Sequence, residues 1–283
     1  MEENKAEEIK RAVLGRYSAH ARRRLADLEE TGTSCCGPAE PRVSETSCCG
    51  PAQPQVSETS SCDCSPAPSA EADLNLAGSL YSVEEMGELP EDVLTSLGCG
   101  NPTAIAGLRE GEAVLDLGSG GGLDCFLAAK KVGPSGRVVG LDMSADMIQL
   151  ARRNARSVGA ENVQFRLGEM EEMPFPDGSF DVIISNCVIN LSPDKDAVLR
   201  ECYRVLKLGG RLRVSDIVWT REPGEKERSD LASWTACVAG ALTEADYASK
   251  LRAAGFREVR VEQKGGPDTP VVNLFSAYIS AEK

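Results

Sequence analysis

The chain alternates between short apolar runs of strand length and longer segments in which apolar residues recur with helical spacing. A helix over 243–254, opened by Thr243-x-x-Asp246, precedes the last two strand-like runs. Such alternation is typical of a mainly parallel sheet covered by helices on both faces. The pattern therefore predicts an α/β fold with seven strands. They are expected at 114–117, 137–142, 163–167, 180–185, 211–218, 258–263 and 274–279.

Polar residues that favour helix starts mark several expected boundaries. Ser82 opens a Ser-x-x-Glu capping box, and Ser144 is placed to cap the helix after the second strand. Ser192 is expected to cap another helix with Pro193 at its first position, and Gly209-Gly210 to close that helix.

Composition divides the chain into four segments. Residues 1–30 carry apolar residues at helical spacing and are expected to form a docking helix without chemistry of its own. Residues 31–73 are rich in Ser, Pro, Thr, Glu and Cys and are expected to be a flexible, disordered segment. Residues 74–222 are expected to form the main part of the α/β domain. Residues 223–283 add an insertion and the helix and strands that complete the sheet.

The segment 31–73 contains an internal repeat. Residues 33–39 recur as 46–52 with a pair of adjacent cysteines in each copy, and a degraded third copy holds Cys62 and Cys64. Neighbouring thiols on a flexible chain suit chelation of a thiophilic ion, although the usual zinc spacing is absent. A low-complexity linker duplicated by chance is the alternative. The candidate accessory ligands are Cys35, Cys36, Cys48 and Cys49.

Charge and composition narrow the classes of partner. The net charge of −13 argues against nucleic acid and anionic membrane surfaces and favours a small substrate. The sequence has no apolar stretch of membrane-spanning length and no secretory signal, so we expect a cytoplasmic protein. Eleven cysteines in that compartment favour metalloid binding or redox chemistry over structural disulfides. His20, the one histidine, is expected to be a solvated surface residue, which excludes mechanisms built on histidine.

A glycine-dense turn directly follows the first predicted strand. Asp116, Gly118, Gly120 and Gly122 alternate with other residues, and a helix is expected over 123–132. Glycine allows the backbone to turn tightly and approach a ligand closely. The acid before the first glycine departs from the dinucleotide fingerprint and resembles motif I of the class I S-adenosylmethionine (SAM) methyltransferases. An ordinary glycine-rich turn is the alternative.

Several polar side chains and one thiol lie at the predicted strand ends. Asp142 ends the second strand roughly twenty residues beyond the glycine turn, where a carboxylate can accept hydrogen bonds from ribose hydroxyls. Glu169 follows the third strand, and Asn186 and Cys187 follow the fourth. Because ligands bind beyond the carboxyl ends of parallel strands, these residues are expected to converge on one cleft.

The remaining cysteines differ in their surroundings. Cys99 lies between two glycines in a loop, which makes it a candidate for contact with a ligand. Cys237 lies among small residues of the predicted insertion, where either a site position or a buried structural role fits. Cys202 and Cys125 fall within apolar helical patterns and are expected to pack in the core.

Seven segments together resemble the arsenite methyltransferases. That family implies the class I SAM-methyltransferase fold, which is Rossmann-like, with a seven-stranded, mostly parallel sheet and helices on both faces. It also implies that Cys187 and Cys237 hold trivalent arsenic and that Cys99 completes the three-sulfur site and takes part in redox turnover. The segments are 98–102, 116–120, 124–125, 140–143, 185–191, 203–207 and 236–242.

The resemblance implies SAM as the cofactor and an external thiol reductant, either thioredoxin or a glutathione-like thiol. The expected activity is methylation of thiol-bound arsenite for arsenic detoxification, with arsenite or its thiol conjugates as substrate. The expected cofactor contacts, from the motifs and the strand ends, are Asp116, Gly118, Ser119, Gly120, Gly122, Asp142, Met143, Glu169, Met170 and Asn186.

Two other functions fit parts of the sequence. A SAM-dependent C- or O-methyltransferase of a small metabolite such as a quinone precursor would have the same fold, but it gives no reason for Cys99, Cys187 and Cys237 together. A noncatalytic thiol protein that binds metalloids or senses redox state would need only the cysteines. The intact glycine turn and Asp142 argue against that second alternative.

Overall fold

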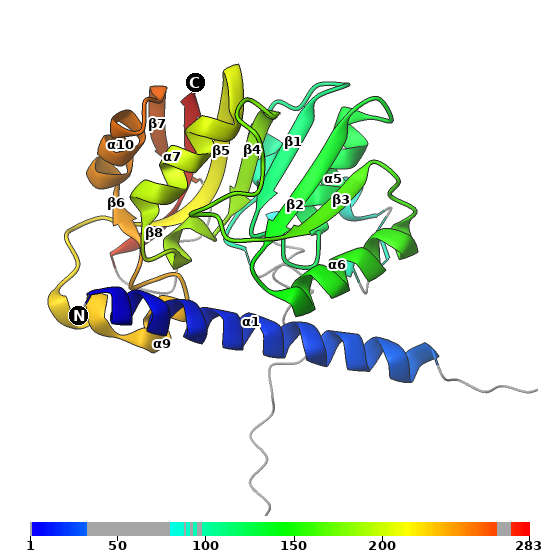
Figure 1. Cartoon of the computed structure of the whole chain (residues 1–283), viewed down its shortest axis with the longest axis horizontal. Helices are drawn as coiled ribbons and strands as arrows, with labels where there is room; N and C mark the ends of the chain where they lie inside the picture. Colours follow the sequence, from blue (N-terminus) through cyan, green and yellow to red (C-terminus); the bar gives the residue numbers. More distant parts are fainter. Residues whose placement is uncertain (1, 33–79, 88, 91–92, 95–97, 265–272) are drawn as a thin grey trace, which may run out of the picture.

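The computed structural model describes residues 2–32, 80–87, 89–90, 93–94, 98–264 and 273–283 (Figure 1). The cysteine-rich repeats lie outside these ranges, so the predictions for Cys35, Cys36, Cys48 and Cys49 concern residues that the structure does not describe. Across the described residues, no helix combines the length and apolarity that crossing a membrane requires.

One mixed sheet forms the centre of the described fold. Its strands follow the order β3-β2-β1-β4-β5-β8-β7, and a short eighth strand, β6, pairs with β5. β8 is antiparallel to both β5 and β7, whereas the pairs among β1 to β5 are parallel. The seven strands on this path are those predicted from the sequence. Their bounds are β1 Ala113–Leu117, β2 Arg137–Asp142, β3 Val163–Leu167, β4 Phe180–Asn186, β5 Leu206–Trp219, β6 Leu242–Thr243, β7 Arg257–Gln263 and β8 Leu274–Glu282.

Helices cover both faces of the sheet, as predicted. On β1, Val114 packs with α5 and α6 on one face, while Leu115 and Leu117 pack with α7 and α10 on the other. Opposite faces follow from the two-residue period of a strand. The helices are α1 Glu2–Gly32, α3 Val83–Met86, α4 Pro102–Ile105, α5 Leu123–Val132, α6 Ala145–Val158, the 3₁₀ turn η2 Ile189–Leu191, α7 Lys195–Val205, α8 Glu225–Ser229, α9 Leu231–Thr235 and α10 Glu244–Ala253.

The predicted helix caps are partly confirmed. The Ser82 and Glu85 side chains exchange capping-box hydrogen bonds with each other's backbone. The Ser144 hydroxyl accepts from the Met147 N–H, and the Thr243 hydroxyl accepts from the Asp246 N–H. The loop predicted around Cys99 ends in the short helix α4, which begins at Pro102.

The predicted cap at Ser192 is wrong. Helix α7 begins at Lys195, and the carboxylate of Asp194 caps it by accepting the Ala197 N–H at 2.9 Å. The Ser192 hydroxyl instead accepts the N–H of Asp194 at 3.1 Å. The Asp194 side chain is itself a good cap acceptor. The residues before Ser192 form the turn η2 and not the approach to a helix.

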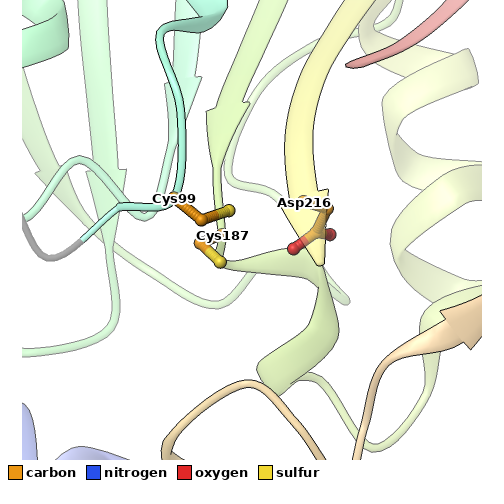
Figure 2. A group of neighbouring side chains, drawn as sticks. All are labelled: Cys99, Cys187 and Asp216. Carbon is orange, nitrogen blue, oxygen red and sulfur yellow. The ribbon is translucent and has the colours of Figure 1, made fainter. Parts of the chain in front are cut away.

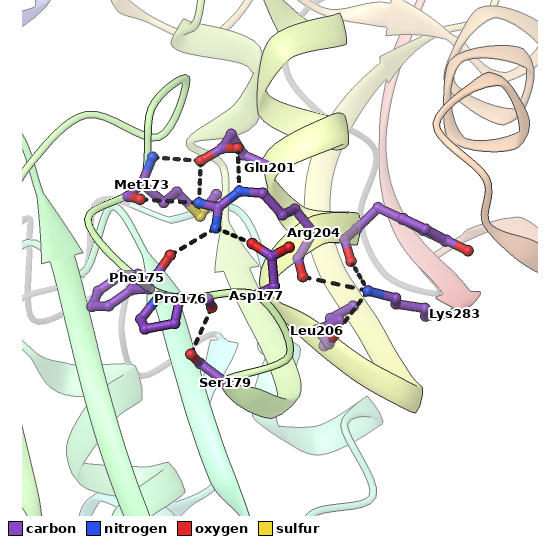
Figure 3. Close-up of polar contacts among 10 residues, drawn as sticks. Met173, Phe175, Pro176, Asp177, Ser179, Glu201, Arg204, Leu206 and Lys283 are labelled. Atoms are coloured by element: carbon purple, nitrogen blue, oxygen red, sulfur yellow. Dashed lines mark hydrogen bonds and ion pairs between the residues drawn. The ribbon is translucent and has the colours of Figure 1, made fainter.

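The glycine pair at 209–210 does not close a helix either. Helix α7 ends at Val205 and strand β5 begins at Leu206, where Lys283 provides hydrogen-bond partners. Gly209 donates to the Lys283 carbonyl, and the Gly210 carbonyl accepts from the Lys283 N–H. The Lys283 ammonium also donates to the carbonyls of Tyr203 and Leu206, at 2.6 and 2.8 Å, which satisfies the end of α7 (Figure 3).

Arg204 ties the end of α7 to the loop before β4. Its guanidinium contacts the carboxylates of Glu201 and Asp177 at 2.7 and 2.8 Å and donates to the carbonyls of Met173 and Phe175 (Figure 3). A planar guanidinium has five donors and can satisfy this many acceptors at once. The loop between β3 and β4 is thereby held next to α7.

Helix α1 lies across the edge of the sheet where the strands β1, β2 and β4 end, and reaches from α9 to α6 (Figure 1). Ile9 and Val13 pack in one apolar cluster with Cys187 and Cys237. Further along, the Ser18 hydroxyl forms a buried 2.9 Å hydrogen bond with the hydroxyl of Ser144. The docking helix expected from the sequence therefore covers the cleft beyond the strand ends.

Candidate functional site

The glycine turn between β1 and α5 has three positive φ angles, 65° at Gly118, 50° at Gly120 and 94° at Gly122. A Cβ atom at Gly118 would lie 2.3 Å from the Val188 side chain, and one at Gly122 would lie 2.8 Å from Phe126. A Cβ at Gly120 would meet no atom within 4 Å. Gly118 and Gly122 therefore allow close packing, while Gly120 borders open space in the cleft.

Asp142 fixes the turn from the neighbouring strand. Its carboxylate accepts hydrogen bonds from the N–H groups of Gly120 and Ser144, at 3.0 and 2.8 Å, while burial raises its pKa. The nearby hydroxyl of Ser119 is buried and has no hydrogen-bond partner among the described residues. A polar acceptor and an unpartnered hydroxyl at a glycine turn fit a ligand that carries hydroxyl or amino groups.

Most of the expected cofactor residues line one cleft between α1 and the strand ends. Helix α1 contributes Tyr17 and also His20, which is therefore a cleft residue and not only a surface residue as predicted. Asp116, Gly122 and Glu169 do not line it. The predicted residues that do are Gly118, Ser119, Gly120, Asp142, Met143, Met170, Asn186 and Cys187.

Asp116 and Glu169 have other contacts. The Asp116 carboxylate accepts a hydrogen bond from the Cys125 thiol at 3.2 Å, and burial together with the charge of Asp124 raises its pKa. Glu169 is half-exposed and pairs with Lys10 of α1. Asp116 therefore connects the strand and the helix on either side of the turn, and Glu169 helps to hold α1 in place.

Three cysteines distant in sequence converge beside the cleft. The sulfur atoms of Cys99 and Cys187 and a carboxylate oxygen of Asp216 all lie within 4.8 Å of one another (Figure 2). The thiol of Cys237 donates to the backbone carbonyl of Cys187 at 2.9 Å. Cys187 and Cys237 are buried, and Cys99 is partly exposed. The expectation from the sequence that these cysteines face one site agrees with this placement.

Two of these cysteines have unusual backbones. Cys187 has φ 62° and Cys237 has φ 65°, in the left-handed region that costs a non-glycine residue about 1–3 kcal/mol. The Cys187 N–H donates to the Ser215 carbonyl at 2.7 Å, and the Cys237 N–H donates to the Trp234 carbonyl at 3.0 Å. The surrounding structure thus holds both residues in strained conformations at the site.

Asn186 holds the loop that carries Cys99. Its carbonyl oxygen accepts from the N–H groups of Cys99 and Gly100, and its amide donates to the Gly100 carbonyl at 2.7 Å. A Cβ at Gly98 would lie 2.3 Å from Asn186, and a Cβ at Gly100 would lie 1.8 Å from the Ser215 hydroxyl. The glycines that flank Cys99 therefore let its loop approach the strand ends.

The insertion before α10 places Cys237. The indole N–H of Trp234, in α9, donates to the Leu191 carbonyl at 3.2 Å. A Cβ at Gly240 would lie 2.0 Å from the Asn190 carbonyl oxygen, so only glycine permits this close approach. The insertion is therefore anchored on η2, the turn that begins two residues after Cys187.

Two thiols of the cluster have raised pKa values. Hydrogen bonds with Cys237 and Cys99, followed by burial, raise the pKa of the Cys187 thiol, and burial raises the pKa of Cys99. Burial also raises the pKa of Asp216 to about 7 and lowers that of the nearby Lys195 to about 8. The raised pKa values favour the neutral form of the Cys99 and Cys187 thiols.

Sequence reasoning missed Asp216 and Tyr17. Asp216 is fully buried inside β5, and the signal for it was an acid within an apolar strand. Tyr17 belongs to the recognised apolar face of α1, but its contact with the cysteine cluster depends on where α1 docks. Cys125 and Cys202 are fully buried in the two main apolar clusters, which confirms their predicted core positions.

Comparisons with known proteins show the family of the chain. The family model described as a methyltransferase domain matches residues 108–255. The crystal structure of CrArsM, an arsenic(III) S-adenosylmethionine methyltransferase from Chlamydomonas reinhardtii, is 36% identical, with a TM-score of 0.56, over 77% of this chain and 74% of that chain. The chain belongs to the arsenic(III) S-adenosylmethionine methyltransferase family.

Curated members of this family are also similar in sequence. The arsenite methyltransferase of Halobacterium salinarum is 45% identical over 243 residues, which is 86% of this chain and 58% of that protein. The arsenite methyltransferase of Aquipseudomonas alcaligenes is 45% identical over 69% of this chain and 56% of that protein. The chain thus spans less than two thirds of the length of these two relatives.

Proposed function

We propose that the chain transfers the methyl group of SAM to trivalent arsenic bound by Cys99, Cys187 and Cys237. The observation that carries the proposal is the convergence of these three cysteines beside a cleft that begins at the glycine turn. Thiolate sulfur is the preferred ligand type of soft, thiophilic centres. A small-metabolite methyltransferase would need the cleft but not the thiols.

The cofactor half of the site is assigned to the cleft residues. When bound, SAM supplies an electrophilic methyl group on a sulfonium sulfur. Asp142 and the unpartnered Ser119 hydroxyl are the polar contacts, and Gly120 allows the cofactor to approach the backbone. Met143 and Met170 form an apolar, polarisable part of the cleft wall.

Neutral thiols suit a neutral substrate. Arsenous acid has three hydroxyl groups, and exchange with three thiols forms three As–S bonds and releases three waters, with no net change of charge. The raised thiol pKa values therefore do not oppose arsenic binding. Cys237 must give up its hydrogen bond to the Cys187 carbonyl and turn its sulfur toward the other two.

Arsenic held by three sulfur atoms keeps a lone pair and is itself the nucleophile, so the chain needs no general base. Its contribution is to place that lone pair in line with the methyl group, and such positioning can contribute up to about 10 kcal/mol. Tyr17 and Met143 belong to the apolar cluster that contains the cysteines, which keeps water away from the arsenic.

Methylation raises the formal oxidation state of arsenic by two, so the cycle requires a reductant. When two of the sulfur ligands leave the arsenic and join to each other as a disulfide, they return two electrons to it. We assign one of these sulfurs to Cys99, which is the partly exposed member of the cluster. A dithiol of the thioredoxin class or a small thiol such as glutathione then reduces the disulfide. The vicinal pairs Cys35-Cys36 and Cys48-Cys49 are assigned to accessory capture of arsenite.

The test is a comparison of acceptors. The purified chain is given SAM with a labelled methyl group together with either arsenite and a thiol reductant or a demethylated quinone precursor. We expect the label in arsenicals only. Transfer to the quinone precursor and none to arsenic would assign the chain to the metabolite methyltransferases.

A further inference from the structure

Asp216 is a buried carboxylate with one unused oxygen. It lies inside β5, and its side chain is fully buried. One oxygen, Oδ2, accepts from the Tyr247 hydroxyl at 3.3 Å, and the other, Oδ1, has no hydrogen-bond partner among the described residues. A buried polar oxygen without a partner is costly, and a bound cation would satisfy it.

The carboxylate faces two thiols. One of its oxygens lies within 4.8 Å of the sulfur atoms of both Cys99 and Cys187, and these two sulfurs also lie within 4.8 Å of each other (Figure 2). A tetrahedral zinc ion with Zn–S bonds of about 2.3 Å requires ligand atoms separated by about 3.8 Å. Side-chain adjustments of about 1 Å would therefore close the three groups around an ion.

This donor set differs from the one assigned to arsenic. Trivalent arsenic binds three sulfurs, whereas two sulfurs and a carboxylate oxygen suit a borderline divalent cation such as Zn²⁺ or Cd²⁺. The thiol of Cys237 points at the Cys187 carbonyl and is not part of the group within 4.8 Å. The same pocket thus offers two overlapping sets of ligands.

We propose that Cys99, Cys187 and Asp216 form a binding site for a divalent thiophilic cation, which competes with arsenite for the two shared sulfurs. The proposal shares these cysteines with the proposed function. Binding releases to solvent the two thiol protons and the Asp216 proton wherever that group is protonated. It forms two metal–sulfur bonds and one metal–oxygen bond, and a water completes the tetrahedron. The charge of Lys195, which interacts with Asp216, offsets part of the resulting negative charge.

The consequence is reversible inhibition. A cation on Cys99 and Cys187 occupies two of the three sulfurs that arsenite needs, so arsenite methylation would fall as the free zinc concentration rises. It would also protect the two thiols from joining as a disulfide, because a metal-bound thiolate is not free to attack a second sulfur.

The test uses the full chain with its tail cysteines, Cys35, Cys36, Cys48, Cys49, Cys62 and Cys64, replaced by serine, so that they bind no metal. Co²⁺ serves as a coloured probe of tetrahedral thiolate coordination, and Zn²⁺ is titrated by displacement of Co²⁺. Two variants are compared, Asp216→Asn and Cys237→Ser. Arsenite binding and the number of As–S bonds are measured on the same samples by X-ray absorption, and circular dichroism shows that each variant is folded.

We expect one Co²⁺ per chain. Asp216→Asn should weaken cation affinity by at least about tenfold, since even the loss of an outer-shell partner has an effect of this size, and should keep three As–S bonds. Cys237→Ser should keep cation affinity within threefold of the parent and retain only two As–S bonds. Unchanged Zn²⁺ affinity in Asp216→Asn, or loss of it in Cys237→Ser, would overturn the cation site. Absence of arsenic methylation with the expected Co²⁺ results would instead overturn the proposed function alone.

Discussion

The thiol of Cys237 donates a 2.9 Å hydrogen bond to the backbone carbonyl of Cys187, and both residues have a left-handed backbone. The insertion that carries Cys237 is thereby connected to the end of β4, the strand next to the one that delivers the glycine turn. The cleft and the thiol cluster therefore lie at one edge of the sheet.

Replacement of Cys237 by serine should remove one arsenic ligand while keeping a hydrogen-bond donor near the Cys187 carbonyl. We expect arsenite affinity to fall at least about tenfold, or about 1.4 kcal/mol, measured by calorimetry. The matched control is Cys202→Ala, a buried cysteine of the core, which should lose about 1 kcal/mol of stability and bind arsenite normally. Equal loss of arsenite binding in both variants would argue against a ligand role for Cys237.

Alanine at Gly100 should displace the Cys99 loop, because the new Cβ would lie 1.8 Å from the Ser215 hydroxyl. We expect a loss of about 1–3 kcal/mol in unfolding free energy together with weaker arsenite binding. Gly15→Ala on α1 is the control, since no atom lies within 4 Å of its added Cβ. That change should stabilise the chain by about 0.5–1 kcal/mol in denaturant unfolding. A stable Gly100→Ala variant with normal arsenite binding would contradict the packing argument.

The Asp142 carboxylate should contribute to SAM affinity through its position beside the glycine turn. Asp142→Asn is expected to weaken SAM binding by about 10–100-fold, the range for a hydrogen bond to a charged group, as measured by calorimetry. Asp146→Asn, four residues along, removes only the ion pair with Arg22 and should change SAM binding little. Similar SAM affinities for the two variants would refute the assignment of Asp142.

The raised pKa of Asp124 predicts that the stability of the chain depends on pH. Burial raises the pKa of Asp124 from 3.8 to about 6, so the folded state binds more protons than the unfolded state between these values. Its contribution to stability is present at low pH and is lost as pH rises from about 4 to about 6, with a slope of up to about 1.4 kcal/mol per pH unit. Asp124→Asn should remove that slope. Unfolding curves of the two proteins that stay parallel from pH 4 to 7 would contradict the shift.

The sheet could be predicted from sequence because its strands are apolar runs bounded by clear turns. The helix starts were harder to predict where two nearby polar residues could both cap the helix. Asp194 caps α7, and Ser192 does not. The boundary at Gly209-Gly210 was misjudged because its hydrogen-bond partner, Lys283, lies 73 or more residues away in the chain.

Two cysteines of the cluster were marked by their position in the sequence, since Cys187 follows a strand end and Cys99 lies in a loop, whereas Cys237 was assigned only through the resemblance to the arsenite methyltransferases. The roles of Asn186 and Asp216 could not be predicted, since both depend on contacts between segments distant in sequence. An acid inside the apolar strand β5 was visible in the sequence, but only the fold shows that it faces Cys99 and Cys187. The docking of α1 over the cleft likewise depends on tertiary contacts such as Ser18 with Ser144.

The most direct test of the account is arsenic speciation after incubation of the purified chain with SAM, arsenite and a thiol reductant. We expect methylated arsenicals from the native chain and none from Cys187→Ser, with SAM binding retained in that variant. Unmodified arsenite as the only arsenic species in the native reaction, with SAM bound, would contradict the account.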